Sequence, residues 1–135
     1  MTDALTWLDR LTRATNDHDL DALTACFADD YENITPAHPS RGFVGRDQVR
    51  RNWEQIFAFV PDVRGTVVAA AADGGTVWSQ WEMRGTRRDG SAHHLAGVII
   101  FEVDGDTARR ATFFLEAVDE SPGSVDDAVR RQVVR

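Results

Sequence analysis

Between residues 64 and 118, long segments rich in β-branched and aromatic residues alternate with tight glycine turns, and this pattern restricts the fold most. The four expected strands cover 64–72, 76–88, 92–103 and 107–118. The turns between them are Asp73-Gly74-Gly75, Asp89-Gly90 and Asp104-Gly105-Asp106. Such short connections join strands that pair side by side, so this half of the chain predicts an antiparallel meander.

Helical patterns come before this meander. Leucines recur at helical spacing over 3–16, and a second, shorter helix follows the Asp19 cap. A short strand at 31–35 leads into a Pro- and Gly-rich loop at 36–45. Asp47 then caps a third helix, whose apolar residues also fall on one face.

These elements predict an α+β fold class. Three N-terminal helices pack on a curved antiparallel sheet, which gives a cone-like α+β roll enclosing a cavity. We expect this domain over residues 1–120, with 121–135 as a C-terminal tail or short helix.

Composition excludes several classes of protein. All 15 basic residues are arginine, and the missing lysine excludes Schiff-base chemistry and a P-loop. The net charge of −7 argues against a nucleic-acid partner. Cys26 is the single cysteine and can form neither an internal disulfide nor a zinc site alone, so we expect no metal and no cofactor. The sequence has no apolar segment of the roughly 20 residues that span a bilayer, and its N-terminus does not resemble a signal peptide. We therefore expect a cytoplasmic protein with no membrane partner.

A two-residue Asp89-Gly90 turn predicts how the two central strands pair. Thr86 then lies opposite His93, and opposed residues point to the same side. One face collects Trp78, Gln80, Glu82, Arg84, His93, Leu95, Gly97, Ile99 and Phe101. The other face collects Val77, Ser79, Trp81, Met83, His94, Ala96, Val98 and Ile100. A slip of one residue would exchange these assignments.

The two faces suggest different partners. The second is mostly apolar and no helix is left to cover it, so we expect a homodimer packed through this outer sheet face. The first mixes aromatic and polar side chains, which suits a cavity for a small apolar ligand.

Two glutamates are candidate catalytic residues. Glu82 is expected inside the cavity, where a raised pKa would let it act as general acid or base. The alternative is an ion pair with Arg84 or Arg110 at a wet rim. Glu116 is either a second acid or base, or a residue at the cavity mouth paired with an arginine.

Three further residues are catalytic candidates from the first half of the chain. Tyr31 and Asn33 share one face of a strand and could bind substrate as a hydrogen-bonding pair, although a tyrosine satisfied by backbone is the alternative. His38 is either a proton shuttle near the mouth or a solvated loop residue. The expected substrate-binding residues are Trp53, Trp78, Gln80, Ile99, Phe101, Arg110, Thr112 and Phe114.

Four short segments carry a family resemblance. They are Phe27-Ala28-Asp29-Asp30-Tyr31, Gly45-Arg46-Asp47, Trp81-Glu82-Met83-Arg84-Gly85-Thr86 and Phe113-Phe114-Leu115-Glu116. Their order over about residues 5–119 resembles the nuclear transport factor 2-like superfamily, and more closely its SnoaL-like members. The resemblance implies the fold but not one reaction, because the superfamily includes polyketide cyclases, ketosteroid isomerases and limonene-epoxide hydrolases.

The resemblance also implies roles for single residues. Tyr31 and Asn33 match the pair that holds the attacking water in the epoxide hydrolases. Glu82 matches a carboxylate of those enzymes, but Thr112 stands where they carry a general-base aspartate. Ile99 stands where many SnoaL-like cyclases carry a buried aspartate, so the sequence departs from both patterns.

The main functional hypothesis is a small cofactor-free enzyme. It would perform isomerisation, cyclisation, dehydration or hydrolysis on an apolar oxygenated molecule such as a polyketide- or terpenoid-like metabolite. Glu82 or Glu116 would move the proton, and Tyr31, Asn33 and Gln80 would orient the substrate. The alternatives are a non-catalytic small-molecule binding protein and a protein-interaction module that uses the outer sheet face.

Overall fold

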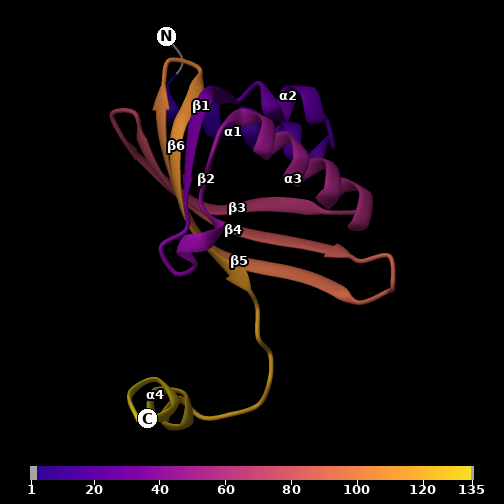
Figure 1. Ribbon diagram of the computed structural model, residues 1–135, viewed down its shortest axis with the longest axis vertical. Helices are drawn as coiled ribbons and strands as arrows, with labels where there is room; N and C mark the ends of the chain where they lie inside the picture. The colour runs from indigo at the N-terminus through magenta and orange to yellow at the C-terminus, as the bar shows by residue number, and fades with distance from the viewer. Residues whose placement is uncertain (1–2, 135) are drawn as a thin grey trace.

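The computed structural model describes residues 3–134, with helices gathered over one face of a strongly curved sheet (Figure 1). The helices are α1 Ala4–Asn16, α2 Leu20–Thr24, the 3-10 turn η1 Pro39–Arg41, α3 Arg46–Phe59 and α4 Val125–Val133. The strands are β1 Phe27–Ile34, β2 Phe43–Val44, β3 Arg64–Asp73, β4 Thr76–Thr86, β5 Ala92–Asp104 and β6 Thr107–Ala117. The α+β fold class is confirmed.

Six strands form one sheet in the order β2-β1-β6-β5-β4-β3. The meander from β3 to β6 is antiparallel, as the glycine turns predict. The pattern did not reveal that β1 pairs with β6 in parallel, with Asn33 beside Ala111. This pair brings the N-terminal strand and the loop after it against the last strand of the meander.

Side-chain caps fix where the first two helices begin. Asp3 accepts the Thr6 N–H at 2.8 Å, and Asp19 accepts the Ala22 N–H at 3.0 Å. The third helix starts two residues earlier than expected, with Gly45 as its N-cap. Asp47 therefore lies in the first turn, where its negative charge interacts favourably with the positive end of the helix dipole.

The core lies between α1 and the concave face of the sheet. Trp7 is fully buried and stacks edge-on against Phe101, with ring centroids 4.7 Å apart. Asn16 at the end of α1 exchanges two hydrogen bonds with the backbone of Gly65, at 2.9 and 2.7 Å. These contacts fix the helix layer against β3 and β5.

The predicted register of the β4–β5 hairpin was wrong by one residue. Thr86 lies opposite Ala92, and Glu82 lies opposite Ala96. The loop has three residues rather than two, because the Arg87 N–H donates to the Ser91 carbonyl at 2.8 Å and Gly90 adopts φ +87°. Since strand side chains alternate, this difference moves every β4 residue to the opposite face.

The corrected register divides the sheet into two clear faces. Toward the helices β4 presents Val77, Ser79, Trp81 and Met83, all of them buried. The outer face carries Trp78, Gln80, Glu82 and Arg84 from β4, together with Val98 and Ile100 from β5. The β5 half of the predicted cavity face was right, and the β4 half was wrong.

The C-terminal segment stands apart from the roll (Figure 1). An extended stretch follows β6 and leads to α4, which has no buried residue. In the described part of the chain, no helix is long and apolar enough to cross a membrane.

Candidate functional site

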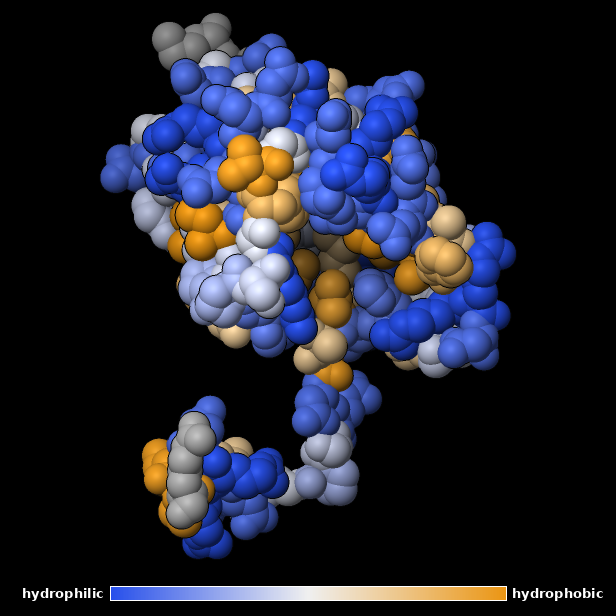
Figure 2. Space-filling view, viewed as in Figure 1, coloured by the Kyte–Doolittle hydropathy of each residue, from blue (hydrophilic) through white to orange (hydrophobic). Residues whose placement is uncertain are grey.

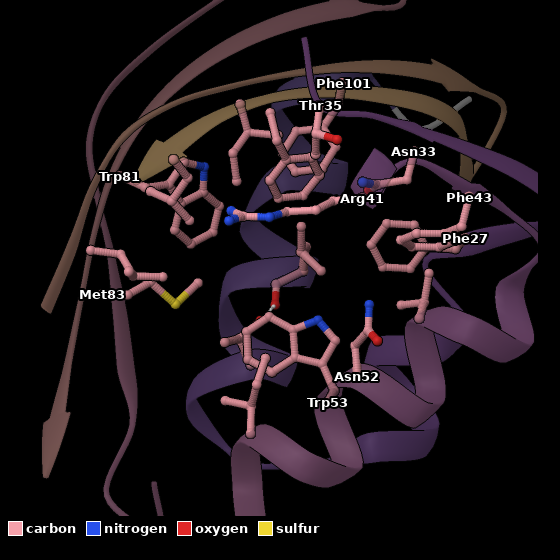
Figure 3. A pocket seen from close by; sticks show the side chains of 18 of the residues that line it. Phe27, Asn33, Thr35, Arg41, Phe43, Asn52, Trp53, Trp81, Met83 and Phe101 are labelled. Carbon is pink, nitrogen blue, oxygen red and sulfur yellow. Dashed lines mark hydrogen bonds between the residues drawn. The ribbon is translucent and has the colours of Figure 1, made fainter. Parts of the chain in front are cut away.

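A cavity of about 320 Å³ opens between the helix layer and the concave face of the sheet. Figure 2 shows it as a hollow with hydrophobic residues inside and a largely hydrophilic surface around it. Its walls are mostly apolar, and their aromatic members include Phe27, Phe43, Trp53, Trp81 and Phe101 (Figure 3). This volume falls at the lower end of the range typical of small-molecule sites.

Tyr31 and Asn33 lie on the β1 wall of the cavity, and both are buried. The Tyr31 hydroxyl donates to Asn33 Oδ1 at 2.6 Å, so its partner is a side chain rather than backbone. This bond fixes the amide orientation and leaves the Asn33 nitrogen directed toward the pocket (Figure 3). Burial raises the pKa of Tyr31 well above its usual range, so the phenol stays neutral.

His38 and Glu116 meet at the mouth of the cavity. The imidazole Nε2 lies 3.0 Å from Glu116 Oε1 and 3.1 Å from Oε2, and both residues line the pocket. His38 comes from the loop after β1 and Glu116 from the end of β6, which the parallel β1–β6 pair brings together. Both side chains are partly exposed, at 37% and 48%, so the pair can reach solvent and ligand alike.

Five polar residues of the pocket were not among the predicted site residues: Thr15, Thr35, Arg41, Asn52 and His93. Arg41 follows His38 on the rim, Asn52 comes from α3, and His93 comes from β5. Burial and the nearby Arg87 lower the pKa of His93, so its imidazole is neutral at physiological pH. Only His93 had a sequence signal, since its strand position already placed it on the cavity face.

Glu82 does not lie in the cavity. Its carboxylate is on the outer face, 3.1 Å from His94 Nε2 and 3.3 Å from Arg84 Nη2. The hydrogen bond from His94 and the charge of Arg84 lower its pKa, the opposite of the expected rise. The one-residue shift of the hairpin explains this error, and the ion-pair alternative with Arg84 is the observed arrangement.

Other expected substrate-binding residues also lie outside the cavity, those of β4 because of the same shift and those of β6 because of how β6 pairs with β5. Trp78 and Gln80 are exposed on the outer face with Phe114, and Thr112 lies opposite Ile100 in that layer. Arg110 is also outside the pocket, where it pairs with Glu32 at 3.0 Å. Of the expected set, the structure places Trp53, Ile99 and Phe101 in the cavity wall.

The inward positions of the central strands hold no acid. They carry Ser79, Trp81 and Met83 on β4, Leu95, Gly97 and Ile99 on β5, and Ala111, Phe113 and Leu115 on β6. Among the described residues that line the cavity, Glu116 is the one carboxylate. Within residues 3–134, no cluster of three or more His, Cys, Asp or Glu could hold a metal ion.

Comparison with known families agrees with this architecture. The family model of the SnoaL-like domain matches residues 8–111, most of the roll. The chain belongs to the SnoaL-like domain family. This SnoaL-like chain has no significant sequence match among proteins of curated function.

Solved structures share the fold of this SnoaL-like protein. IdmH, a proposed polyketide cyclase from Streptomyces antibioticus, has a TM-score of 0.72 at 19% identity, covering 86% of this chain and 92% of its own. A proposed ketosteroid isomerase from Kribbella flavida has a TM-score of 0.67 at 22% identity, covering 96% and 85%. A ketosteroid isomerase-like protein from Catenulispora acidiphila, in complex with trimethylamine, has a TM-score of 0.68 at 17% identity, covering 78% and 82%. At these identities the likeness shows the fold alone.

Proposed function

We propose that this SnoaL-like chain is a small enzyme that uses general acid–base chemistry on an apolar, oxygenated small molecule such as a polyketide- or terpenoid-like metabolite. One observation carries the proposal: the hydrogen-bonded His38–Glu116 pair stands at the mouth of an otherwise mainly apolar cavity. A carboxylate held by an imidazole can accept and return a proton, and the aromatic walls exclude water from the substrate.

In the proposed mechanism, Glu116 removes a proton from a carbon next to a substrate carbonyl. The electron pair of the C–H bond moves into the carbonyl and forms an enolate, whose oxygen accepts a hydrogen bond from the Asn33 amide. Return of the proton to another carbon gives isomerisation. Attack of the enolate on a second carbonyl, with transfer of the Glu116 proton to the new alkoxide, gives cyclisation. Expulsion of a hydroxyl group that takes up the Glu116 proton and leaves as water gives dehydration.

Hydrolysis is the fourth reaction of the proposal. It would need Glu116 to remove a proton from water instead of carbon, while His38 keeps the carboxylate in place. The proposed cyclase and isomerase activities of IdmH and the Kribbella protein support the carbon-acid reactions more directly.

The first experiment finds a ligand and then compares two glutamates. Thermal shifts with a panel of polycyclic, lactone and epoxide metabolites identify a binder, and turnover is followed by deuterium uptake from D2O or by product formation. Glu116→Gln should lower kcat by about 10² to 10⁴, the usual contribution of a general base.

Glu82→Gln is the matched control, because Glu82 is also held by a histidine but lies on the outer face. Its kcat should stay close to that of the wild type. Full turnover by the Glu116→Gln variant would refute the proposed base.

A non-catalytic small-molecule binding protein is the second candidate. It is favoured by the lack of any carboxylate at the inward positions of β4, β5 and β6. This candidate predicts that the wild type binds a ligand and releases it unchanged, with no deuterium incorporated.

We also propose that two copies associate through the outer sheet face. Exposed apolar side chains gather there, with Val68, Trp78 and Phe114 between 44% and 53% exposed. Val77, Ser79, Trp81 and Met83, expected in this interface, are buried on the inner face instead. A cytoplasmic location stays a prediction of the N-terminal sequence.

A further inference from the structure

Arg41 reaches into the cavity from its rim. It ends the 3-10 turn η1, whose N-cap is His38, and its backbone N–H donates to the His38 carbonyl at 2.9 Å. In a 3-10 turn, side chains three residues apart fall on the same side. His38 and Arg41 therefore both face the pocket, and Figure 3 shows the guanidinium extended across it toward Trp81.

The Arg41 side chain has no acidic partner in the described part of the chain. Within residues 3–134, no carboxylate oxygen lies within 4.0 Å of its guanidinium, whereas Arg46 and Arg50 nearby pair with Asp29 and Asp21. The one carboxylate of the pocket, Glu116, is instead bound by His38. An arginine is always charged, so the pocket contains a cation that forms no ion pair with any residue of 3–134.

The other polar groups of the pocket do not supply the missing negative charge. Tyr31 is a neutral phenol because burial raises its pKa, and His93 is a neutral imidazole because burial and Arg87 lower its pKa. Thr15, Asn33, Thr35 and Asn52 are polar but uncharged, and aromatic and aliphatic side chains make up most of the remaining walls. Arg41 is itself exposed, so its guanidinium is accessible to a ligand that enters the cavity.

We propose that the cavity binds an aromatic or alicyclic carboxylate, with its carboxyl group paired to Arg41 and its ring between Trp53 and Trp81. The planar guanidinium donates two parallel hydrogen bonds to a carboxylate, which fixes the direction of the ligand as well as its charge. This inference rests on the proposed function, for which it names the substrate class.

The test compares naphthoate with naphthamide, which have the same ring and differ in charge. Their affinities are measured by titration calorimetry at neutral pH for the wild type, Arg41→Gln and Arg41→Lys. Arg51→Gln is the control, because Arg51 is an exposed arginine of α3 whose side chain bonds only Gln48 among the described residues.

The wild type should bind naphthoate about tenfold or more tightly than naphthamide, the size of effect expected for a hydrogen bond to a charged group. Arg41→Gln should remove this preference and leave the affinity for naphthamide unchanged. Arg41→Lys should keep part of the preference for naphthoate, because lysine keeps the positive charge but lacks the planar guanidinium that donates two parallel hydrogen bonds. Arg51→Gln should change neither affinity.

Equal affinity of the wild type for naphthoate and naphthamide would overturn the inference. An Arg41→Gln variant that loses affinity for both probes to the same extent would overturn it as well. Failure of both probes to bind would also overturn it. A charge preference that depends on Arg41, in a protein that turns over no carboxylate, would leave this inference standing and refute the proposed enzyme.

Discussion

At the scale of single residues, the Tyr31–Asn33 bond is a buried polar contact between two side chains of the cavity wall. Tyr31→Phe keeps the ring and removes the donor, which leaves Asn33 Oδ1 without its partner inside the protein. We expect the free energy of unfolding to fall by about 1–2 kcal/mol. Urea unfolding of the variant beside the wild type measures this, and an unchanged midpoint would show that the bond contributes nothing net.

His93 makes stability depend on pH. Burial, with Arg87, lowers its pKa in the folded state below the usual 6.5. Below pH 6.5 the unfolded chain therefore binds protons more readily, and stability is lost as pH falls toward the folded pKa of His93. We expect His93→Gln to show a smaller loss of unfolding free energy between neutral pH and about pH 5.

The measurement is urea unfolding at several pH values for both proteins. The difference between the two curves isolates His93 from the other histidines. Identical pH dependence in the two proteins would contradict the expectation.

At the scale of elements, the sequence predicted the order of the three N-terminal helices, the first strand and the four-stranded meander, but not the length of one turn. Asp89-Gly90 suits a two-residue hairpin and equally the end of a three-residue loop, and only the Arg87–Ser91 backbone bond distinguishes them. The consequence is large, because a single residue decides whether Glu82 or Trp81 faces the ligand.

Gly97 is the element-scale position most sensitive to substitution. It adopts φ +151° in β5, and a Cβ atom there would lie 2.0 Å from the Phe114 carbonyl oxygen. We expect Gly97→Ala to lower the free energy of unfolding by about 3 kcal/mol or more, since backbone cannot move aside cheaply. Thermal and urea unfolding measure the loss.

Gly123→Ala is the control for this substitution. No heavy atom lies within 4 Å of its added Cβ, so its stability should stay within about 0.5 kcal/mol of the wild type. Similar stability of the two variants would contradict the clash at Gly97.

At the scale of the whole molecule, the fold could be predicted because many weak signals agreed. The site could be predicted only in part. Tyr31, Asn33, His38 and Glu116 do line the cavity, as expected from polar residues at strand and loop positions beside it, while their catalytic roles stay predictions. Arg41 was missed because its direction depends on a 3-10 turn within the loop at 36–45, for which the Pro and Gly pattern predicts only irregular structure.

The association of two copies is also a property of the whole molecule. Trp78→Glu places a charge in the centre of the exposed apolar face, and we expect it to convert the proposed dimer into a monomer. Phe59→Glu is the control, because Phe59 is 61% exposed but lies at the end of α3. Light scattering after gel filtration gives the masses, and a monomeric wild type would contradict the proposed dimer.

The parallel pairing of β1 with β6 has a consequence for synthesis on the ribosome. Residues that meet across this pair, such as Glu32 and Arg110, are 78 positions apart in the chain, and so are His38 and Glu116. Until β6 has emerged from the ribosome, β1 lacks the strand that pairs with it in parallel. The mouth of the cavity then also lacks Glu116. The pocket therefore forms only after nearly all of the domain has been translated, and until then its aromatic walls are surfaces that a chaperone can recognise.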